Sequence, residues 1–220
     1  MAITAKTIGK KALGAKAQGA KGQAAQGQVA AALVEEPATL PDLVRNNLDV
    51  IFVGINPSTY SVVQGHYFAR KTNRFWPAFS QSVLSLSVRT ARGIDRLEPH
   101  HDTLLQDHGF GFTDAVKRAS PRATDISPKE FADGVADLLE KFKELQPRIA
   151  CFHGIMAYRA VHRLLTGSKD DPLLGVQPDL LNIGRTRLFL APNPSPANAH
   201  FTPADQVAWY DRLAEILARD

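Results

Sequence analysis

The feature that most constrains the fold is a short, largely apolar run at residues 48–53. Its β-branched residues are typical of a strand that is buried on both faces of an α/β sheet. Gly54 ends the run, and Asn56 and Pro57 then supply the chemistry of a turn. Ligands bind at the carboxyl ends of strands in open α/β sheets, so we expect a binding loop after Gly54.

The rest of the chain alternates between strand and helix patterns. We expect strands at 110–113, 148–153, 180–183 and 187–190, and helices at 73–86, 102–106, 127–145, 155–165 and 203–217. Residues 87–99 have no regular pattern, and residues 114–122 read as an exposed basic connection. The alternation predicts a three-layer α/β/α sandwich with a short, mainly parallel central sheet.

Composition excludes several classes of protein. The single cysteine, Cys151, cannot form a disulfide framework, an iron–sulfur cluster or a cysteine-based zinc site within one chain. The seven histidines lack metal-ligand spacing, so we expect no metal and no cofactor. No apolar run reaches the roughly 18 residues of a membrane span, and no secretory pattern opens the chain. We expect a monomer in the cytoplasm, associated with the nucleoid if the source is bacterial.

Residues 1–38 differ in composition from the rest of the chain. They are rich in Ala, Gly and Gln and lack aromatic residues, and five lysines precede the first acid, Glu35. The whole chain has a formal charge of +4, so residues 35–220 carry −1 once those five lysines are set aside. We expect a disordered basic tail at 1–38 and one domain at 39–220. The tail is either a tether for a polyanion or a solubilising extension.

Four motifs occur in order along the predicted domain. They are GINPS at 54–58, GHYFARKTNRFW at 65–76, GFTDAVKR at 111–118 and NPSPANAH at 193–200. Together they resemble the mismatch-specific uracil/thymine DNA glycosylases of the uracil-DNA glycosylase superfamily. The resemblance extends over about residues 46–220, and it implies the superfamily's α/β fold and no cofactor.

The resemblance implies an enzyme that flips uracil, and related mismatched or damaged bases, out of double-stranded DNA. Such an enzyme hydrolyses the N-glycosidic bond and leaves an abasic site, the first step of base excision repair. A flipped base needs an aromatic ring for stacking and hydrogen bonds to its pairing edge. Phe68 matches the family's stacking ring, and Asn56 matches the residue that holds the attacking water. The matching base pocket is formed by Gly54, Ile55, Pro57, Ser61, Phe68 and Asn73.

The segment at 193–200 matches the loop that the family inserts into the duplex. The residues implied in intercalation and backbone contact are Asn193, Ser195, Pro196, Ala197 and Asn198. Two departures stand out. Pro196 and Ala197 stand where some relatives carry Gly and a Leu wedge, and Asn193 stands where more active relatives carry His. We therefore expect slow turnover.

Asp114 is a second catalytic candidate, and the resemblance does not supply its role. Asn56 can orient a water but cannot accept its proton, and no acid lies between Asp49 and Trp76. Asp114 ends the predicted strand at 110–113, on the same edge of the sheet, where a carboxylate could act as a general base. Alternatively it caps the following turn or pairs with Arg118.

Three other functions remain open at the level of the sequence. The same pocket suits another lesion, such as an exocyclic cytosine adduct or hypoxanthine. A protein that binds damaged DNA without turnover fits the missing His and wedge. The last alternative is a small-molecule binding domain with an incidental basic tail.

Overall fold

The computed structural model describes residues 39–219, so the predicted tail at 1–38 lies outside the described residues. The five strands are β1 (Val50–Gly54), β2 (Phe110–Asp114), β3 (Ile149–His153), β4 (Gly175–Val176) and β5 (Arg187–Ala191). They form one sheet in the order β2-β1-β3-β5-β4. Only β4 runs antiparallel to its neighbour, so the prediction of a mainly parallel sheet is confirmed.

The central strands bury both of their faces, as the run at 48–53 predicts. In β1, Val50 and Phe52 belong to one hydrophobic core, whereas Ile51 and Val53 belong to another on the opposite face. The neighbouring strands β3 and β5 alternate in the same way. Two cores separated by one sheet require helices on both sides, which is the predicted three-layer sandwich.

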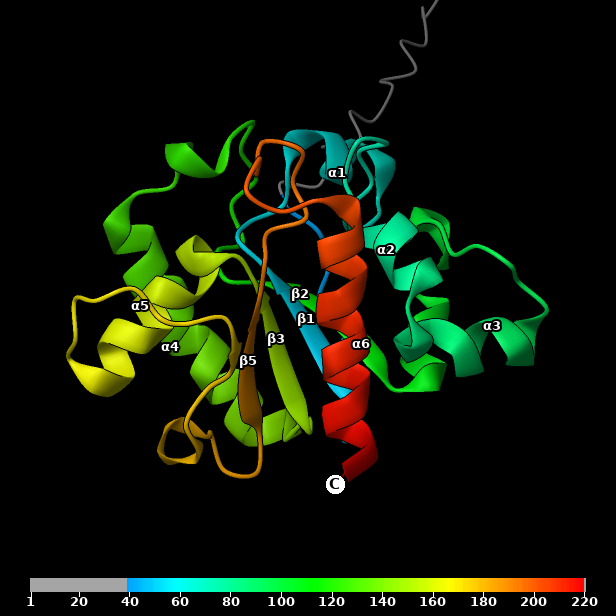
Figure 1. The fold of residues 1–220 in the computed structure, drawn as a ribbon. Helices are drawn as coiled ribbons and strands as arrows, with labels where there is room; N and C mark the ends of the chain where they lie inside the picture. The colour runs from blue at the N-terminus through cyan, green and yellow to red at the C-terminus, as the bar shows by residue number, and fades with distance from the viewer. Residues whose placement is uncertain (1–38, 220) are drawn as a thin grey trace, which may run out of the picture. The chain divides into compact units, whose positions relative to one another are not determined.

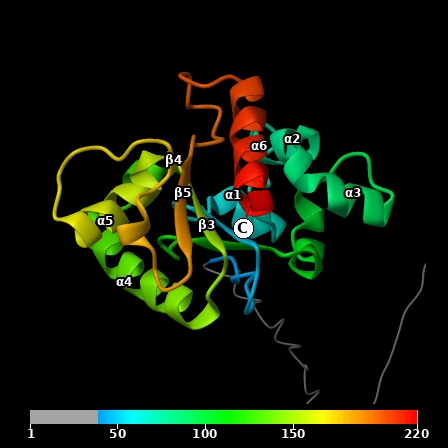
Figure 2. The same ribbon diagram turned by 60° about the horizontal axis from the view of Figure 1, so that its bottom comes forward.

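The helices divide between the two faces of the sheet (Figure 1). One core is covered by α2 (Phe75–Gln81) and α6 (Pro203–Arg219), with α3 (Leu86–Arg92) beside them, and the other by α4 (Pro128–Leu145) and α5 (Ile155–Thr166). The turned view in Figure 2 shows the same division, with α4 and α5 on the side away from α2 and α3. None of the helices in residues 39–219 has the length and apolar character needed to cross a bilayer.

Several predicted elements are confirmed with small changes at their ends. Ser127 and Glu130 form a capping box where the helix was expected to begin: the Ser127 Oγ accepts a hydrogen bond from the Glu130 amide at 3.3 Å, and the Glu130 Oε2 accepts one from the Ser127 amide at 2.9 Å. This arrangement satisfies amide groups that the first turn of a helix leaves free. The box fixes the start of α4.

The segment between β1 and β2 differs most from the prediction. Residues 59–64, expected as loop, form α1 (Thr59–Gln64), because the Ser58 Oγ accepts a hydrogen bond from the Ser61 amide at 3.1 Å. The helix expected at 73–86 ends at Gln81. Ser82 then caps a 3-10 turn, Val83–Ser85, and α3 follows through residues expected to be irregular. The helix expected at 102–106 is a 3-10 turn, Leu104–His108.

The strand expected at 180–183 is also wrong. Residues Asp179–Leu181 form a 3-10 turn, and the edge strand is β4, at Gly175–Val176. Leu180 is 85% exposed, so its apolar character does not reflect burial. A run of Leu and Ile is compatible with a strand and a turn alike, and here the tertiary context decides.

Candidate active site

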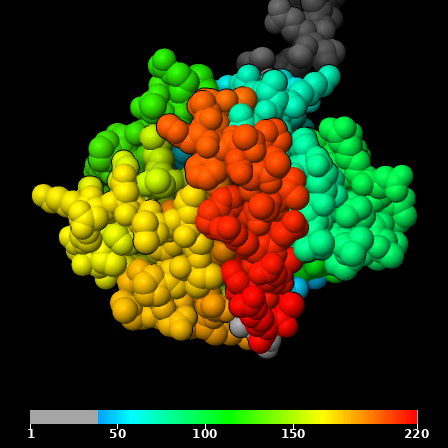
Figure 3. Space-filling view, in the orientation of Figure 1, coloured from blue at the N-terminus to red at the C-terminus, as the bar shows by residue number. Residues whose placement is uncertain are grey.

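A cleft of about 950 Å³ lies where β1, β2, β3 and β5 end. In the space-filling view of Figure 3, the segment before α6, drawn in orange, lies between the green and cyan surfaces at this end. The structure places all thirteen predicted site residues on the lining of this one cleft. They are Gly54, Ile55, Asn56, Pro57, Ser61, Phe68, Asn73, Asp114, Asn193, Ser195, Pro196, Ala197 and Asn198.

Asn56 is held in a fixed orientation just after β1. Its Nδ2 donates to the Arg118 carbonyl at 3.0 Å, to the Ser120 Oγ at 2.8 Å and to the Pro57 carbonyl at 3.2 Å. All three acceptors bind the NH₂ group, so the amide cannot turn over without losing them. The Oδ1 is therefore kept as an acceptor, which is the atom that would hold a water by one of its hydrogens.

Phe68 is half-buried and lines the cleft from a constrained backbone. Its φ of 52° lies in the left-handed region, which is uncommon for a bulky residue. The preceding residue is fixed on both sides: the Tyr67 amide donates to the Asp102 Oδ2 at 2.9 Å, and the Trp76 Nε1 donates to the Tyr67 carbonyl at 2.8 Å. Strain that the surroundings hold in place is typical of residues that position a ligand.

The Phe68 ring also packs against two neighbouring rings. It stacks on Phe75 with ring centroids 4.5 Å apart and an angle of 16°, and it meets the edge of His153 at 5.2 Å. Phe68 thus packs against the hydrophobic core and also lines the cleft. A ring that is already stacked on its partner can receive a flat ligand without rearranging.

Two polar residues between β1 and α2, one on α1 and one on the loop before α2, complete the predicted base pocket. The Asn73 Oδ1 accepts a hydrogen bond from the Phe75 amide at 2.9 Å, which starts α2 and leaves the NH₂ group as a donor toward the cleft. Ser61 is buried, and its Oγ accepts a hydrogen bond from Ser58 at 3.1 Å. These contacts orient both side chains before any ligand binds.

Asp114 ends β2 and is buried, contrary to the prediction that residues 114–122 form an exposed connection. Ala115 and Val116 are buried with it, because their amides continue the sheet by donating to the carbonyls of Gly54 and Ile55, each at 2.9 Å. The ion pair considered with Arg118 is absent, since that guanidinium binds Glu130 at 2.5 Å.

The surroundings of Asp114 favour its neutral form. Burial raises the pKa of the carboxyl to about 7, and the Asp42 carboxylate contributes in the same direction, whereas Lys117 and Lys141 act against it. Lys117 and Lys141 both bind Asp42, which also accepts a hydrogen bond from Thr113 at 2.6 Å. The Asp114 Oδ2 has no hydrogen-bond partner in the structure. A carboxyl with a pKa near neutrality is suited to proton transfer.

The loop at 193–201 is held together by its own polar groups. The Asn193 Oδ1 accepts from the Ser195 amide at 2.9 Å, and the Asn198 Nδ2 donates to the Asn193 carbonyl at 3.0 Å. These bonds leave Pro196 and Ala197 exposed at the turn of the loop. The predicted intercalation residues therefore form one ordered turn.

The lining of the cleft also includes residues that were not predicted, among them Ser120 and His153. Ser120 accepts the shortest hydrogen bond from Asn56, but its position 64 residues later in the chain gives no local signal. His153 is the last residue of β3, so a polar side chain at the end of a buried strand was the signal that could have identified it. Burial lowers the pKa of His153 to about 3 and keeps the ring neutral, with its Nε2 3.0 Å from the Tyr210 hydroxyl. Among residues 39–219, no cluster of three or more His, Cys, Asp or Glu side chains could hold a metal ion.

Comparison with known proteins agrees with this arrangement. The chain is 30% identical over 190 residues to a G/U mismatch-specific uracil DNA glycosylase of Schizosaccharomyces pombe. The match covers 84% of this chain but 56% of the relative, so the chain spans little more than half of that protein's length.

A solved structure is similar in fold. It is the solution NMR structure of a candidate uracil DNA glycosylase from Methanosarcina acetivorans, with a TM-score of 0.51 and 19% identity. The match covers 80% of this chain and 97% of that one. The family model of the uracil DNA glycosylase superfamily matches residues 41–214. The chain therefore belongs to the uracil DNA glycosylase superfamily.

Proposed function

We propose that this protein is a monofunctional DNA glycosylase that removes uracil, and related mismatched or damaged bases, from double-stranded DNA. One observation carries the proposal. A single cleft holds a supported aromatic ring, a fixed amide and a buried carboxyl, contributed by Phe68, Asn56 and Asp114. Membership of the superfamily and the named activity of the yeast relative support the same conclusion.

The residues of the cleft divide the work of the reaction. The flipped base stacks on Phe68, and the loop backbone near Ile55 with the Asn73 amide meets its pairing edge. When the glycosidic bond breaks, its electron pair leaves with the base and the sugar gains cationic character. The Asn56 Oδ1 holds a water against the sugar carbon, and ionised Asp114 takes a proton from that water as its oxygen attacks.

A cleavage assay tests the proposal directly. The full chain is incubated with duplexes that carry uracil, thymine or hypoxanthine opposite guanine, and abasic sites are then cut with alkali. We expect strand scission at uracil and less at the other two bases. Scission only at hypoxanthine would assign the cleft to another lesion, and binding without any scission would replace the glycosylase with a damage-binding protein.

The division of work predicts different losses in two variants. Phe68→Ala removes base stacking, worth about 1–3 kcal/mol, which lowers affinity for the damaged duplex. Asn56→Ala leaves stacking intact but frees the water, so it lowers the single-turnover rate at saturating enzyme. If both variants showed small and equal effects on affinity and on rate, the flipped base would have to bind outside this cleft.

A further inference from the structure

Arg74 connects the base-binding segment to the loop at 193–201. It lies one residue after Asn73, directly before α2, and its side chain is partly buried. Its Nη1 donates to the Asn198 carbonyl at 3.0 Å and to the Phe201 carbonyl at 2.6 Å. Its backbone amide donates to the Pro194 carbonyl at 2.9 Å.

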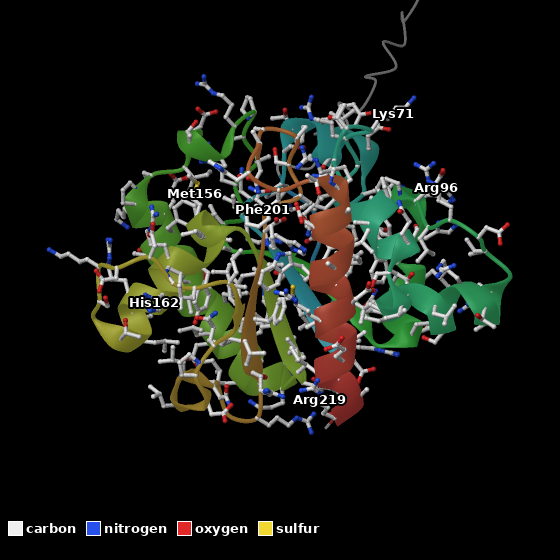
Figure 4. All side chains as sticks on the ribbon, in the orientation of Figure 1. Lys71, Arg96, Met156, His162, Phe201 and Arg219 are labelled. Atoms are coloured by element: carbon white, nitrogen blue, oxygen red, sulfur yellow. The ribbon has the colours of Figure 1, made fainter. Side chains whose placement is uncertain are left out.

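The three acceptors are spread along the whole loop. Pro194 lies at its start, Asn198 after the exposed turn, and Phe201 just before α6. Phe201 is labelled in Figure 4, at the end of the molecule where the cleft opens. A residue that binds a loop at its start, middle and end fixes the position of the turn between them. The guanidinium therefore uses both hydrogens of its Nη1 on protein carbonyls, and the backbone amide supplies the third contact.

We propose that Arg74 is a positioning residue that sets the 193–201 loop for insertion into the duplex. The inference rests on the glycosylase function proposed above. Through Arg74, the segment that carries Asn73 and the loop that faces the DNA move as one unit. Binding of the flipped base and insertion of the loop into the space that the base leaves are therefore coupled.

The small residues at the turn make this positioning important. Pro196 and Ala197 are exposed, but neither carries a long side chain that could reach into the stack by itself. Proteins that unstack DNA insert apolar wedges such as Phe, Leu, Ile, Met or Pro, and of these the proline ring is the shortest. Here the backbone of the loop must bring the turn to the duplex, so a small displacement of the loop should lower the rate of duplex cleavage. In single-stranded DNA there is no opposite base for the loop to contact, so cleavage of a single strand does not depend on the loop.

Lysine cannot replace this arginine. The planar guanidinium presents two hydrogens on one nitrogen in fixed directions, which match the two carbonyls, whereas an ammonium is a mobile point charge. Arg74→Lys therefore keeps the charge near the DNA and loses the geometry. Arg74→Met removes both.

The experiment compares single-turnover cleavage of uracil in a single strand with cleavage in a duplex opposite guanine, at saturating enzyme. The readout is the ratio of the duplex rate to the single-strand rate. We expect this ratio to fall about 10²-fold in Arg74→Met, as for a loop misplaced by about 1 Å, and to fall in Arg74→Lys as well. Lys71→Met is the control, because Lys71 is an exposed residue of the same segment (Figure 4). Its ratio should match that of the wild type.

Three outcomes would overturn the assignment of Arg74. An unchanged ratio in both Arg74 variants would do so, and a ratio restored by Arg74→Lys would assign the residue to phosphate binding by charge alone. Failure of both variants to fold would make it a residue of overall stability. Wild-type protein that cleaves uracil in neither substrate would instead overturn the proposed function, so the two failures are distinguishable.

Discussion

Asp114 shows at the scale of one residue how the site departs from ordinary packing. A buried carboxyl without a hydrogen-bond partner on Oδ2 costs free energy when it is charged. Its pKa of about 7 reflects that cost. The same shift makes the group a base that is half-ionised at neutral pH, so one feature affects both catalysis and stability.

The catalytic effect is predicted first. Asp114→Asn keeps the size of the side chain and removes the base, so single-turnover cleavage of uracil should fall about 10²-fold or more. Wild-type cleavage should rise as the pH passes through about 7, because the carboxyl must be ionised to act. The variant should lose this rise. A variant with the wild-type pH profile would show that another group titrates.

The effect on stability has the opposite sign. The folded protein holds the Asp114 proton up to pH 7, whereas the unfolded chain releases it near pH 3.9. The unfolded state therefore binds fewer protons between about pH 4 and 7, and the free energy of unfolding decreases across this window. Asp114→Asn removes the penalty. Its Tm should exceed that of the wild type at pH 8, by more than at pH 5; equal gains at both values would contradict the pKa shift.

At the scale of elements, α4 approaches the loop after β2 unusually closely. A Cβ atom at Gly134, in the middle of the helix, would lie 2.2 Å from the Ala115 carbonyl oxygen. Neither atom belongs to a flexible side chain, so the helix or the strand end would have to move. The helix thus supports the segment that carries Asp114.

This contact reverses the usual effect of alanine in a helix. Gly→Ala in an exposed helix interior stabilises by about 1 kcal/mol, but Gly134→Ala should lower the free energy of unfolding by about 1–3 kcal/mol through overpacking. Denaturant unfolding measures the change. Asp137→Ala, at an exposed position of the same helix, serves as the control and should stay within about 0.5 kcal/mol. A stabilised Gly134→Ala would show that the contact relaxes easily.

The sequence predicts those elements whose signals are local. The start of the helix at Ser127 and the burial of β1 on both faces depend on neighbours within four residues, and both predictions are confirmed. The short α1 and the true edge strand β4 escape prediction, because a six-residue helix and a two-residue strand carry little periodic signal. The sequence does not indicate the close contact at Gly134 either, since the contacting atom is a backbone oxygen that only the fold brings near.

The residues of the site divide in the same way, into those that local sequence signals identify and those that only the fold brings together. Polar residues after buried strands point to Asn56 and Asp114, and the order of the motifs along the chain adds the loop at 193–200. The partners that fix these residues come from distant segments: Ser120 for Asn56, and Arg74 for Asn198. Their roles depend on hydrogen bonds across the fold, so no spacing in the chain reveals them.

At the scale of the whole molecule, charge is distributed unevenly along the chain. Five lysines precede Glu35, and the remainder is close to neutral. Binding to DNA depends strongly on salt in proportion to the phosphates that are neutralised. The body of the protein would therefore bind DNA with a small salt dependence, and residues 1–38 would supply most of the electrostatic attraction.

Deletion of residues 1–38 tests this division. We expect weaker DNA binding and a smaller slope of log affinity against log salt, by up to about 4.5 if all five lysines contact phosphates. Single-turnover cleavage at saturating enzyme should remain near the wild-type value, because the cleft lies within residues 39–219. An unchanged slope would leave the segment as a solubilising extension.

The contact between Gly54 and Asp114 also has a consequence for the history of such a protein. A Cβ atom at position 54 would lie 2.2 Å from the Asp114 Oδ1, so a larger residue at 54 requires the Asp114 carboxyl to turn away from its present position. A lineage that loses the acid gives up a costly group and frees position 54 to vary. Once a larger side chain is fixed there, an acid that returns at 114 meets that side chain and takes another orientation. Loss of the carboxyl is therefore easier to acquire than to reverse.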